Sequence, residues 1–141
     1  MYDEKKLNRF IVAQERMYEP ILKELARGEK RTHWIWFIFP QIKGLGNSNT
    51  SLFYAIQSLD EAKAYLSHPI LGQRLTECCE LLIKIQGKRI DQILPPPDDL
   101  KLRSSMTLFS VASPETLIFK DVLKKYFNGA RDQRTLKMLG M

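Results

Sequence analysis

Hydrophobic residues recur every three or four positions through most of the chain, a spacing typical of amphipathic helices packed on a common core. The first such stretch begins after Asp3, a residue type that caps helix N-termini well, and contains Leu7 and Phe10. A second stretch restarts at Pro20, because proline suits a first helical turn, and stops at Gly28. The pattern therefore predicts two helical segments before residue 28.

The same spacing continues towards the C-terminal end, with helix start and stop signals between the stretches. Ser58 and Glu61 form a capping-box pattern, and Pro69 precedes a long amphipathic stretch that ends at Gly87. Further helices are predicted near Ser51, after Asp98 or Asp99, after Ser113 and after Asp132. We expect an all-α, multihelical fold of about six to seven helices in a single domain over residues 1–141.

Between His33 and Gln41 lies a short aromatic and apolar segment, near 33–39, that fits either a β-strand or a buried helical turn. Its Trp, Phe and Ile side chains hold more apolar area than a surface segment leaves in water. We therefore expect a core segment that includes Trp36. The alternative is a pocket rim built from His33, Trp34 and Gln41.

Composition excludes several classes of protein. Of the 141 residues, 44% are hydrophobic and 27% are charged, which is typical of a globular domain and excludes general disorder. No apolar run reaches ~18 residues, so we expect no membrane span. The first ten residues lack the apolar core of a signal peptide, and a cytoplasmic location is the expectation. Cys78 and Cys79 are adjacent and have no ligand-spaced partners, so we expect neither a metal site nor a cofactor.

The charge balance favours phosphate-bearing partners without specifying one. Lys and Arg total 22 against 16 acidic residues, a formal net charge of +6. The basic residues are spread along the chain, and no nucleic-acid-binding motif accompanies them. A solvated surface is therefore favoured over a nucleic-acid interface, and the sequence leaves the oligomeric state open.

Two polar segments have the composition of an anion site. Gly44, Gly46 and Ser48 precede a predicted helix and form either a plain turn or an anion-binding loop. Further on, Lys101, Ser104 and Ser105 lie beside the apolar stripe of a predicted helix. These groups suit a phosphate or a ribose, but the hydroxyls can equally bond back to helix carbonyls.

Other polar residues have competing interpretations. Gln14 occupies an inward position of the first stripe, where it serves either as a satisfied structural amide or as a pocket wall. Asp99 and Asp132 could act as acids or bases, and each also suits a helix cap. The two cysteines lie in the middle of a predicted helix without an evident charged activator four positions away, which argues against a reactive thiolate.

Taken together, these segments resemble the bacterial family known as domain of unknown function 1810, sometimes labelled calpastatin-like. The resemblance covers residues 9 to 136 and implies a compact multihelical fold, but it implies no activity. Its matching motifs are Arg9-Phe10-x-x-Ala13-Gln14, His33-Trp34-x-Trp36-Phe37-x-Phe39-Pro40-Gln41, Gly44-Leu45-Gly46-x-Ser48, Glu61-Ala62-x-x-Tyr65-Leu66-x-His68-Pro69-x-Leu71-Gly72-x-Arg74-Leu75, Asp99-x-Lys101-Leu102-x-Ser104-Ser105-Met106-Thr107-Leu108-Phe109 and Asp132-x-x-Thr135-Leu136.

A looser likeness concerns NADAR-type domains, which are N-glycosidases acting on ADP-ribose derivatives or riboside intermediates. It rests on the order of Ala13-Gln14, Leu71-Gly72-x-Arg74, Lys101-Leu102 and Gly129. The likeness implies a class of ligand only.

Two functions remain open, and so does the question of whether the protein is an enzyme. The first is a pocket for a nucleotide or ADP-ribosyl-like small molecule, with a hydrolytic, N-glycosidase-like reaction as an option. The second is a non-catalytic module that binds a protein or a nucleic acid. For the pocket, Trp34 would stack on the ligand, and Asp99 or Asp132 would position a water. The ligand-binding candidates are Arg9, Gln14, His33, Trp34, Gln41, Lys101, Ser104 and Ser105.

Overall fold

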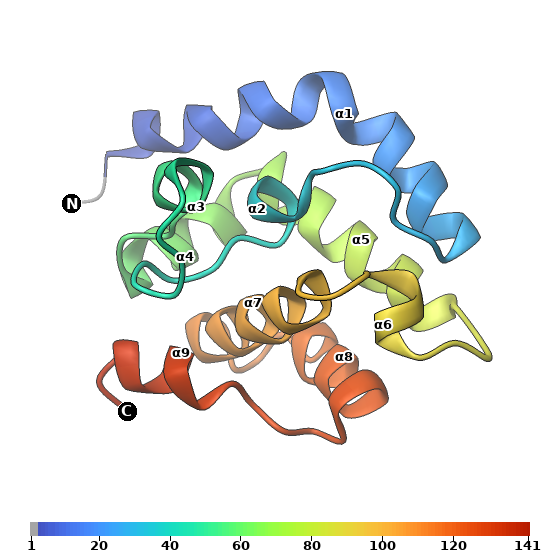
Figure 1. Ribbon diagram of the computed structural model, residues 1–141. Helices are drawn as coiled ribbons and strands as arrows, with labels where there is room; N and C mark the ends of the chain where they lie inside the picture. Colours follow the sequence, from blue (N-terminus) through green and yellow to red (C-terminus); the bar gives the residue numbers. More distant parts are fainter. Residues whose placement is uncertain (1–2) are drawn as a thin grey trace.

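The computed structural model describes residues 3–141, and over that range it is built from helices (Figure 1). Met1 and Tyr2, which the single-domain prediction included, lie outside the described residues. The helices are η1 (Glu4–Leu7, a 3₁₀ turn), α1 (Asn8–Arg27), α2 (Ile35–Ile38), α3 (Asn49–Tyr54), α4 (Leu59–Ser67), α5 (Leu71–Lys84), α6 (Ile90–Ile93), α7 (Asp98–Ala112), α8 (Ile118–Phe127) and α9 (Gln133–Met138).

The prediction of an all-α fold is confirmed, but its helix count was too low. Residues 3–141 form nine α-helices rather than six or seven, in part because several short turns count as helices of their own. The apolar segment near 33–39 contains one of these turns, α2, and not a strand. The described chain has one isolated parallel bridge, between Ile42 and Ile56, which ties the loop after α2 to the end of α3.

The first helix is continuous where the sequence predicted two segments. Pro20 lies inside α1, and the helix changes direction along its length (Figure 1). A proline inside a helix removes one backbone hydrogen bond and bends the helix without ending it when packing holds both halves. Ile21 and Leu25, beyond the proline, are buried in the same core as Phe10 before it. The helix ends at Gly28, as predicted, in a left-handed conformation with φ of 73°.

Two helix caps predicted from the sequence are present. The Ser58 hydroxyl accepts a hydrogen bond from the Glu61 backbone N–H at 3.1 Å and starts α4. The Asp132 carboxylate accepts one from the Thr135 backbone N–H at 3.0 Å and starts α9. Each cap satisfies a backbone donor that the first helical turn leaves unpaired.

Helix α7 is central, packing against α4, α8 and α9, while α1 and α5 cover the other side of the core (Figure 1). Its buried positions include serines and a threonine as well as apolar residues, so this helix brings hydroxyl groups into the interior. No helix among residues 3–141 has the length and hydropathy needed to cross a membrane. The largest fully buried side chains are Trp34, Tyr65, Phe10, Phe39, Phe109 and Phe119.

Candidate functional site

A cleft of about 330 Å³ lies where the loop before α3, the first half of α7 and the start of α9 meet. This volume falls at the lower end of the range of ~300–1,000 Å³ that small-molecule sites occupy. Segments far apart in the sequence therefore form its walls. Its lining residues are Gln41, Leu45, Gly46, Ser51, Pro97, Leu100, Lys101, Arg103, Ser104, Asp132 and Arg134.

Three cationic side chains and one carboxylate line this cleft, so its walls carry an excess of positive charge. Arg103 donates from Nε to the carbonyl of Ala130 at 2.9 Å and from Nη2 to that of Arg131 at 3.0 Å. Arg134 donates to the carbonyl of Leu45 at 3.5 Å. A guanidinium carries more N–H donors than these contacts use, and both arginines keep donors for an anion.

Lys101 is held at the cleft by a small charge network. Its Nζ lies 3.7 Å from Asp98 Oδ1 and 4.9 Å from the centre of the Trp36 ring. Asp98 also pairs through Oδ2 with the buried Lys30 at 2.8 Å. Because the two lysines share one carboxylate, the network leaves net positive charge beside the cleft.

Asp132 ties α9 to α7 and forms part of the cleft wall. Its Oδ2 accepts hydrogen bonds from the Ser104 hydroxyl at 3.1 Å and from both the N–H and the hydroxyl of Thr135. Its own backbone N–H donates to Thr107 Oγ1 at 2.8 Å. The carboxylate therefore acts first as a helix cap and an interhelix clasp.

A second, much smaller cavity, with a volume of about 10 Å³, adjoins the cleft. Trp36 is one of its lining residues, and the indole nitrogen of Trp36 is buried without a hydrogen-bond partner in the described part of the chain. We call this cavity the inner void. It is lined by Trp36, Gln41, Ile42, Gly44, Gly46, Ser51, Tyr54 and Ala55.

The chain that carries Trp36 is anchored by a buried carboxylate, Glu24 of α1. Glu24 accepts hydrogen bonds from the backbone N–H groups of Arg31 and Thr32, from the Thr32 hydroxyl and from the Trp34 indole. Burial alone would raise the pKa of Glu24, but these hydrogen bonds outweigh it and lower the pKa from 4.5 to about 2. Glu24 thus fixes the connection from α1 into α2.

Four of the predicted site residues meet at the cleft: Gln41, Lys101, Ser104 and Asp132. The Ser104 hydroxyl also donates to the carbonyl of Leu100 at 3.2 Å, the back-bonding that the sequence left as an alternative. Ser104 therefore combines the two interpretations of its hydroxyl, because it bonds to a carbonyl of its own helix and also lines the cleft.

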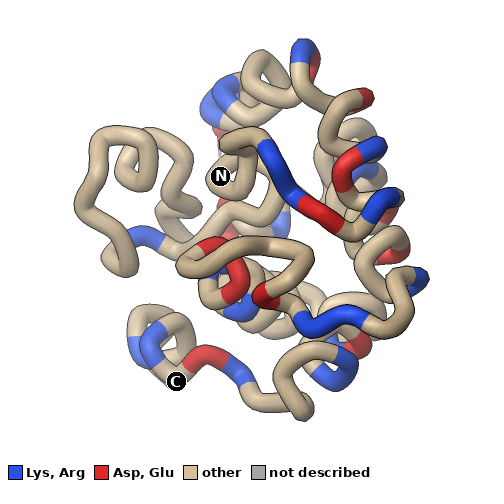
Figure 2. The backbone as a smooth tube through the Cα atoms, turned by 45° about the vertical axis from the view of Figure 1, so that its right-hand side comes forward, with Lys and Arg blue, Asp and Glu red and all other residues tan. Residues whose placement is uncertain are grey.

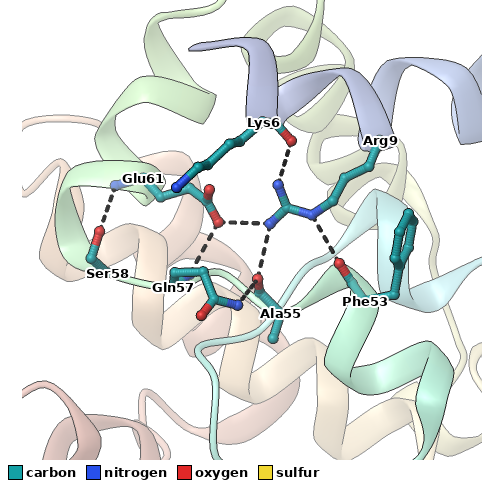
Figure 3. A network of polar contacts seen from close by, with 7 residues as sticks. All are labelled: Lys6, Arg9, Phe53, Ala55, Gln57, Ser58 and Glu61. Atoms are coloured by element: carbon teal, nitrogen blue, oxygen red, sulfur yellow. Dashed lines mark hydrogen bonds and ion pairs between the residues drawn. The ribbon is translucent and has the colours of Figure 1, made fainter. Parts of the chain in front are cut away.

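Arg9 lies elsewhere, in a polar network between α1, α3 and α4 (Figure 3). Its guanidinium forms an ion pair with Glu61 at 2.7 Å and donates to the carbonyls of Phe53 and Ala55, each at 2.9 Å, and to that of Lys6. These contacts join three helices, and they give Arg9 a structural role in the folded chain.

Gln14 and Trp34 are both completely buried. The Gln14 amide nitrogen donates to the carbonyl of Phe37 at 2.6 Å and to the Tyr65 hydroxyl at 3.1 Å, which matches the structural interpretation of this residue. Trp34 is 0% exposed and its indole N–H donates to Glu24 at 3.0 Å, which favours the core interpretation of this segment over the alternative of a pocket rim. His33 beside it is exposed. Ligand-binding roles for these residues stay predictions.

Asp99 and Ser105 also lie away from the cleft. Asp99 accepts a hydrogen bond from the Leu100 N–H at 2.9 Å and lines a different groove, with residues of α6 and α8. Ser105 is completely buried in α7, and its hydroxyl has no partner among residues 3–141. The helix period explains this outcome, because Ser105 is rotated from Ser104 towards the centre of the core.

Sequence reasoning missed three residues that shape the site: Arg103, Arg134 and Trp36. Arg103 stands two positions after Lys101, a spacing at which the helix period does not place two side chains on one face. Arg134 follows the predicted cap Asp132 by two residues. The cap placed Arg134 in the first turn of a helix beside a candidate site residue, which is the signal that could have identified it. Trp36 was predicted in the core, but it is only partly buried.

The charged residues elsewhere do not gather on one element (Figure 2). Lys and Arg occur on most helices with Asp and Glu between them. Among residues 3–141 the two signs of charge are therefore interspersed, unlike the one-sign stripe of long nucleic-acid interfaces.

Comparisons with known proteins place the chain among proteins without a stated activity. A model of the family described as "Protein of unknown function (DUF1810)" matches residues 4–139. The crystal structure of the conserved hypothetical protein Rv1873 from Mycobacterium tuberculosis, at 1.38 Å, is similar, with 48% sequence identity, a TM-score of 0.96 and coverage of 99% of both chains. A search of curated proteins found no match. These matches lend no support to the likeness with NADAR-type domains.

Proposed function

We propose that this chain, which belongs to the DUF1810 family, binds a small phosphate-bearing molecule of the nucleotide or ADP-ribosyl type in the cleft between α7, α9 and the loop before α3. The observation that carries the proposal is the meeting of Lys101, Arg103 and Arg134 in a cleft of about 330 Å³. Cations that converge from separate segments on one concave surface favour an anionic ligand.

The lining side chains divide into two kinds. Lys101 and the two arginines supply positive charge, and arginine forks suit the paired oxygens of a phosphate. Ser104, Ser51 and Gln41 supply neutral hydrogen-bonding groups on the same walls. A ligand with both a phosphate and uncharged polar groups would use both sets.

The proposal is limited to binding. Asp132 is the one carboxylate among the lining residues, and its Oδ2 already accepts three hydrogen bonds. Asp99, the other predicted catalytic residue, lines a different groove. A hydrolytic reaction at this cleft stays a prediction.

Thermal unfolding at low ionic strength tests the binding, because a ligand that binds only the folded protein raises its melting temperature. We expect ADP-ribose, AMP and pyrophosphate to raise it, and uncharged adenosine to leave it nearly unchanged. Lys101→Ala should abolish the increase, while the melting temperature of the free protein changes little, since Lys101 contributes a partly exposed ion pair.

Lys124→Ala is the matched control, because Lys124 is exposed on α8 and its replacement removes the same charge. This variant should keep the stabilisation by phosphate-bearing compounds. If no phosphate-bearing compound stabilises the wild type, or if Lys101→Ala keeps the full effect, the binding proposal is wrong. The interaction-module hypothesis would then lead.

A further inference from the structure

The inner void beside the cleft extends this proposal. Gln41, Gly46 and Ser51 line both spaces, so the void is the inward continuation of the cleft. Its volume of about 10 Å³ is enough for one water or one oxygen of a ligand. Position 46 has no room for a side chain, because a Cβ there would lie 2.8 Å from the Ser51 side chain.

Two hydrogen-bonding side chains at the void have no partner among residues 3–141. The Trp36 indole nitrogen is buried and unpaired. Gln41 accepts a hydrogen bond through its backbone carbonyl, from the Ile56 N–H at 2.8 Å, but its side-chain amide forms none. Buried donors are almost always paired in native proteins, so an unpaired indole beside a cleft points to a missing partner.

We infer that the inner void is a subsite for a sugar hydroxyl, and that the ligand is a phosphorylated sugar or a molecule that contains one. This inference rests on the proposed function. The indole is a donor only, whereas an amide oxygen accepts. A hydroxyl can accept from Trp36 Nε1 and donate to Gln41 Oε1 together, whereas an ionised phosphate oxygen has no proton and could only accept, from Trp36 Nε1 and from the amide Nε2 of Gln41.

The position of Lys101 supports this division of the ligand. Its ammonium lies 4.9 Å from the centre of the Trp36 ring and also lines the cleft. Trp36 therefore lines the void and contacts Lys101, a residue of the cleft wall. A phosphate beside Lys101 and a hydroxyl in the void would belong to one small molecule that contacts both.

Binding of ribose 5-phosphate and of inorganic phosphate, measured by calorimetry at low ionic strength, tests the inference. Trp36→Phe removes the indole N–H and keeps a ring beneath Lys101. The variant should bind ribose 5-phosphate about 3-fold to 10-fold more weakly, the range expected for one hydrogen bond, and should bind inorganic phosphate as the wild type does.

Trp34→Phe is the matched control, because it removes an indole N–H that is bonded within the core. It should lower the melting temperature and leave the ratio of the two affinities unchanged. Gln41→Leu removes the second unpaired group of the void. It should also weaken the binding of ribose 5-phosphate and leave the binding of inorganic phosphate unchanged, and it replaces Trp36→Phe in the test if that variant does not fold.

The outcomes separate the two proposals. If the wild type binds both compounds, and if Trp36→Phe or Gln41→Leu weakens both equally or neither, the hydroxyl subsite is wrong and the proposed function stands. If the wild type binds neither compound, the hydroxyl subsite is wrong, and the proposed function is decided by the thermal unfolding with ADP-ribose, AMP and pyrophosphate.

Discussion

Replacing Glu24 by glutamine removes a negative charge from the core and keeps the shape of the side chain. Glu24 is 3% exposed and accepts four hydrogen bonds, between 2.6 and 3.0 Å long, from Arg31, Thr32 and Trp34. A glutamine can keep the bonds to its remaining oxygen. The substitution therefore measures the contribution of the charge to these bonds.

The size of the effect follows from the pKa. The pKa of Glu24 is about 2 in the folded protein, whereas a glutamate without these contacts has a pKa of 4.5. Each pKa unit corresponds to ~1.36 kcal/mol. The ionised carboxylate therefore stabilises the fold by about 3 kcal/mol at pH 7. Because the folded pKa is the lower one, this contribution is complete above pH 4.5 and is lost as the pH falls towards 2.

Urea unfolding of the wild type and Glu24→Gln across this pH range is the assay. We expect the free energy of unfolding to be about 3 kcal/mol lower in the variant at pH 7, and the gap to shrink to about 1 kcal/mol at pH 3. Glu29→Gln is the control, since Glu29 is exposed and pairs with Arg31 at the surface. A gap that stays constant between pH 7 and pH 3, or no gap at pH 7, would refute the reasoning.

Two further predictions concern the packing of α5. Gly72→Ala should lower the free energy of unfolding by about 1–3 kcal/mol in urea titrations, because a Cβ there would lie 2.1 Å from the Leu66 carbonyl oxygen. The control Gln73→Ala, at the adjacent exposed position, should lower it by less than about 0.5 kcal/mol, and equal effects of the two changes would contradict the prediction. Burial raises the pKa of the Cys78 thiol to about 12 and that of the Cys79 thiol well above its ordinary value. Ellman's reagent at pH 8 should therefore label both thiols in urea and neither in the folded protein, and rapid labelling of the folded protein would contradict this prediction.

Local signals predicted some helix ends and misplaced others, since α8 begins at Ile118 with Leu117 as its N-cap and not directly after Ser113. Ser58 and Asp132 cap their helices as the sequence indicated, because a cap depends on residues only three positions away. Pro20 shows the limit of such rules. Its local preference predicted a new helix, but burial of Ile21 and Leu25 in the common core keeps α1 continuous.

The two tryptophans show what periodicity leaves open. The segment that holds Trp34 and Trp36 has no polar position to set its phase, so the sequence did not indicate which ring faces inward. In the structure Trp34 is the ring that faces inward, and its indole N–H donates a hydrogen bond to Glu24, ten positions earlier in the chain. A tertiary hydrogen bond of this kind has no signature in the local pattern.

The site was predictable in part for the same reason. Lys101 and Ser104 are three positions apart on one helix, so their common location follows from the helix period. Gln41 and Arg134 join them only because α9 packs against α7 and the loop, through contacts such as Asp132 with Ser104. Arg9 and Gln14 have the residue types of a binding site, but the fold uses both to connect helices.

Helix α9 has six residues and supplies two of the groups in the cleft, Asp132 at its cap and Arg134 in its first turn. Short elements open locally at a lower free energy than the core, and each opening of α9 would dismantle one wall of the cleft. A ligand that requires that wall would hold α9 closed and slow the hydrogen exchange of its amides. The exchange rate of α9 would then report the occupancy of a site that lies largely on other helices.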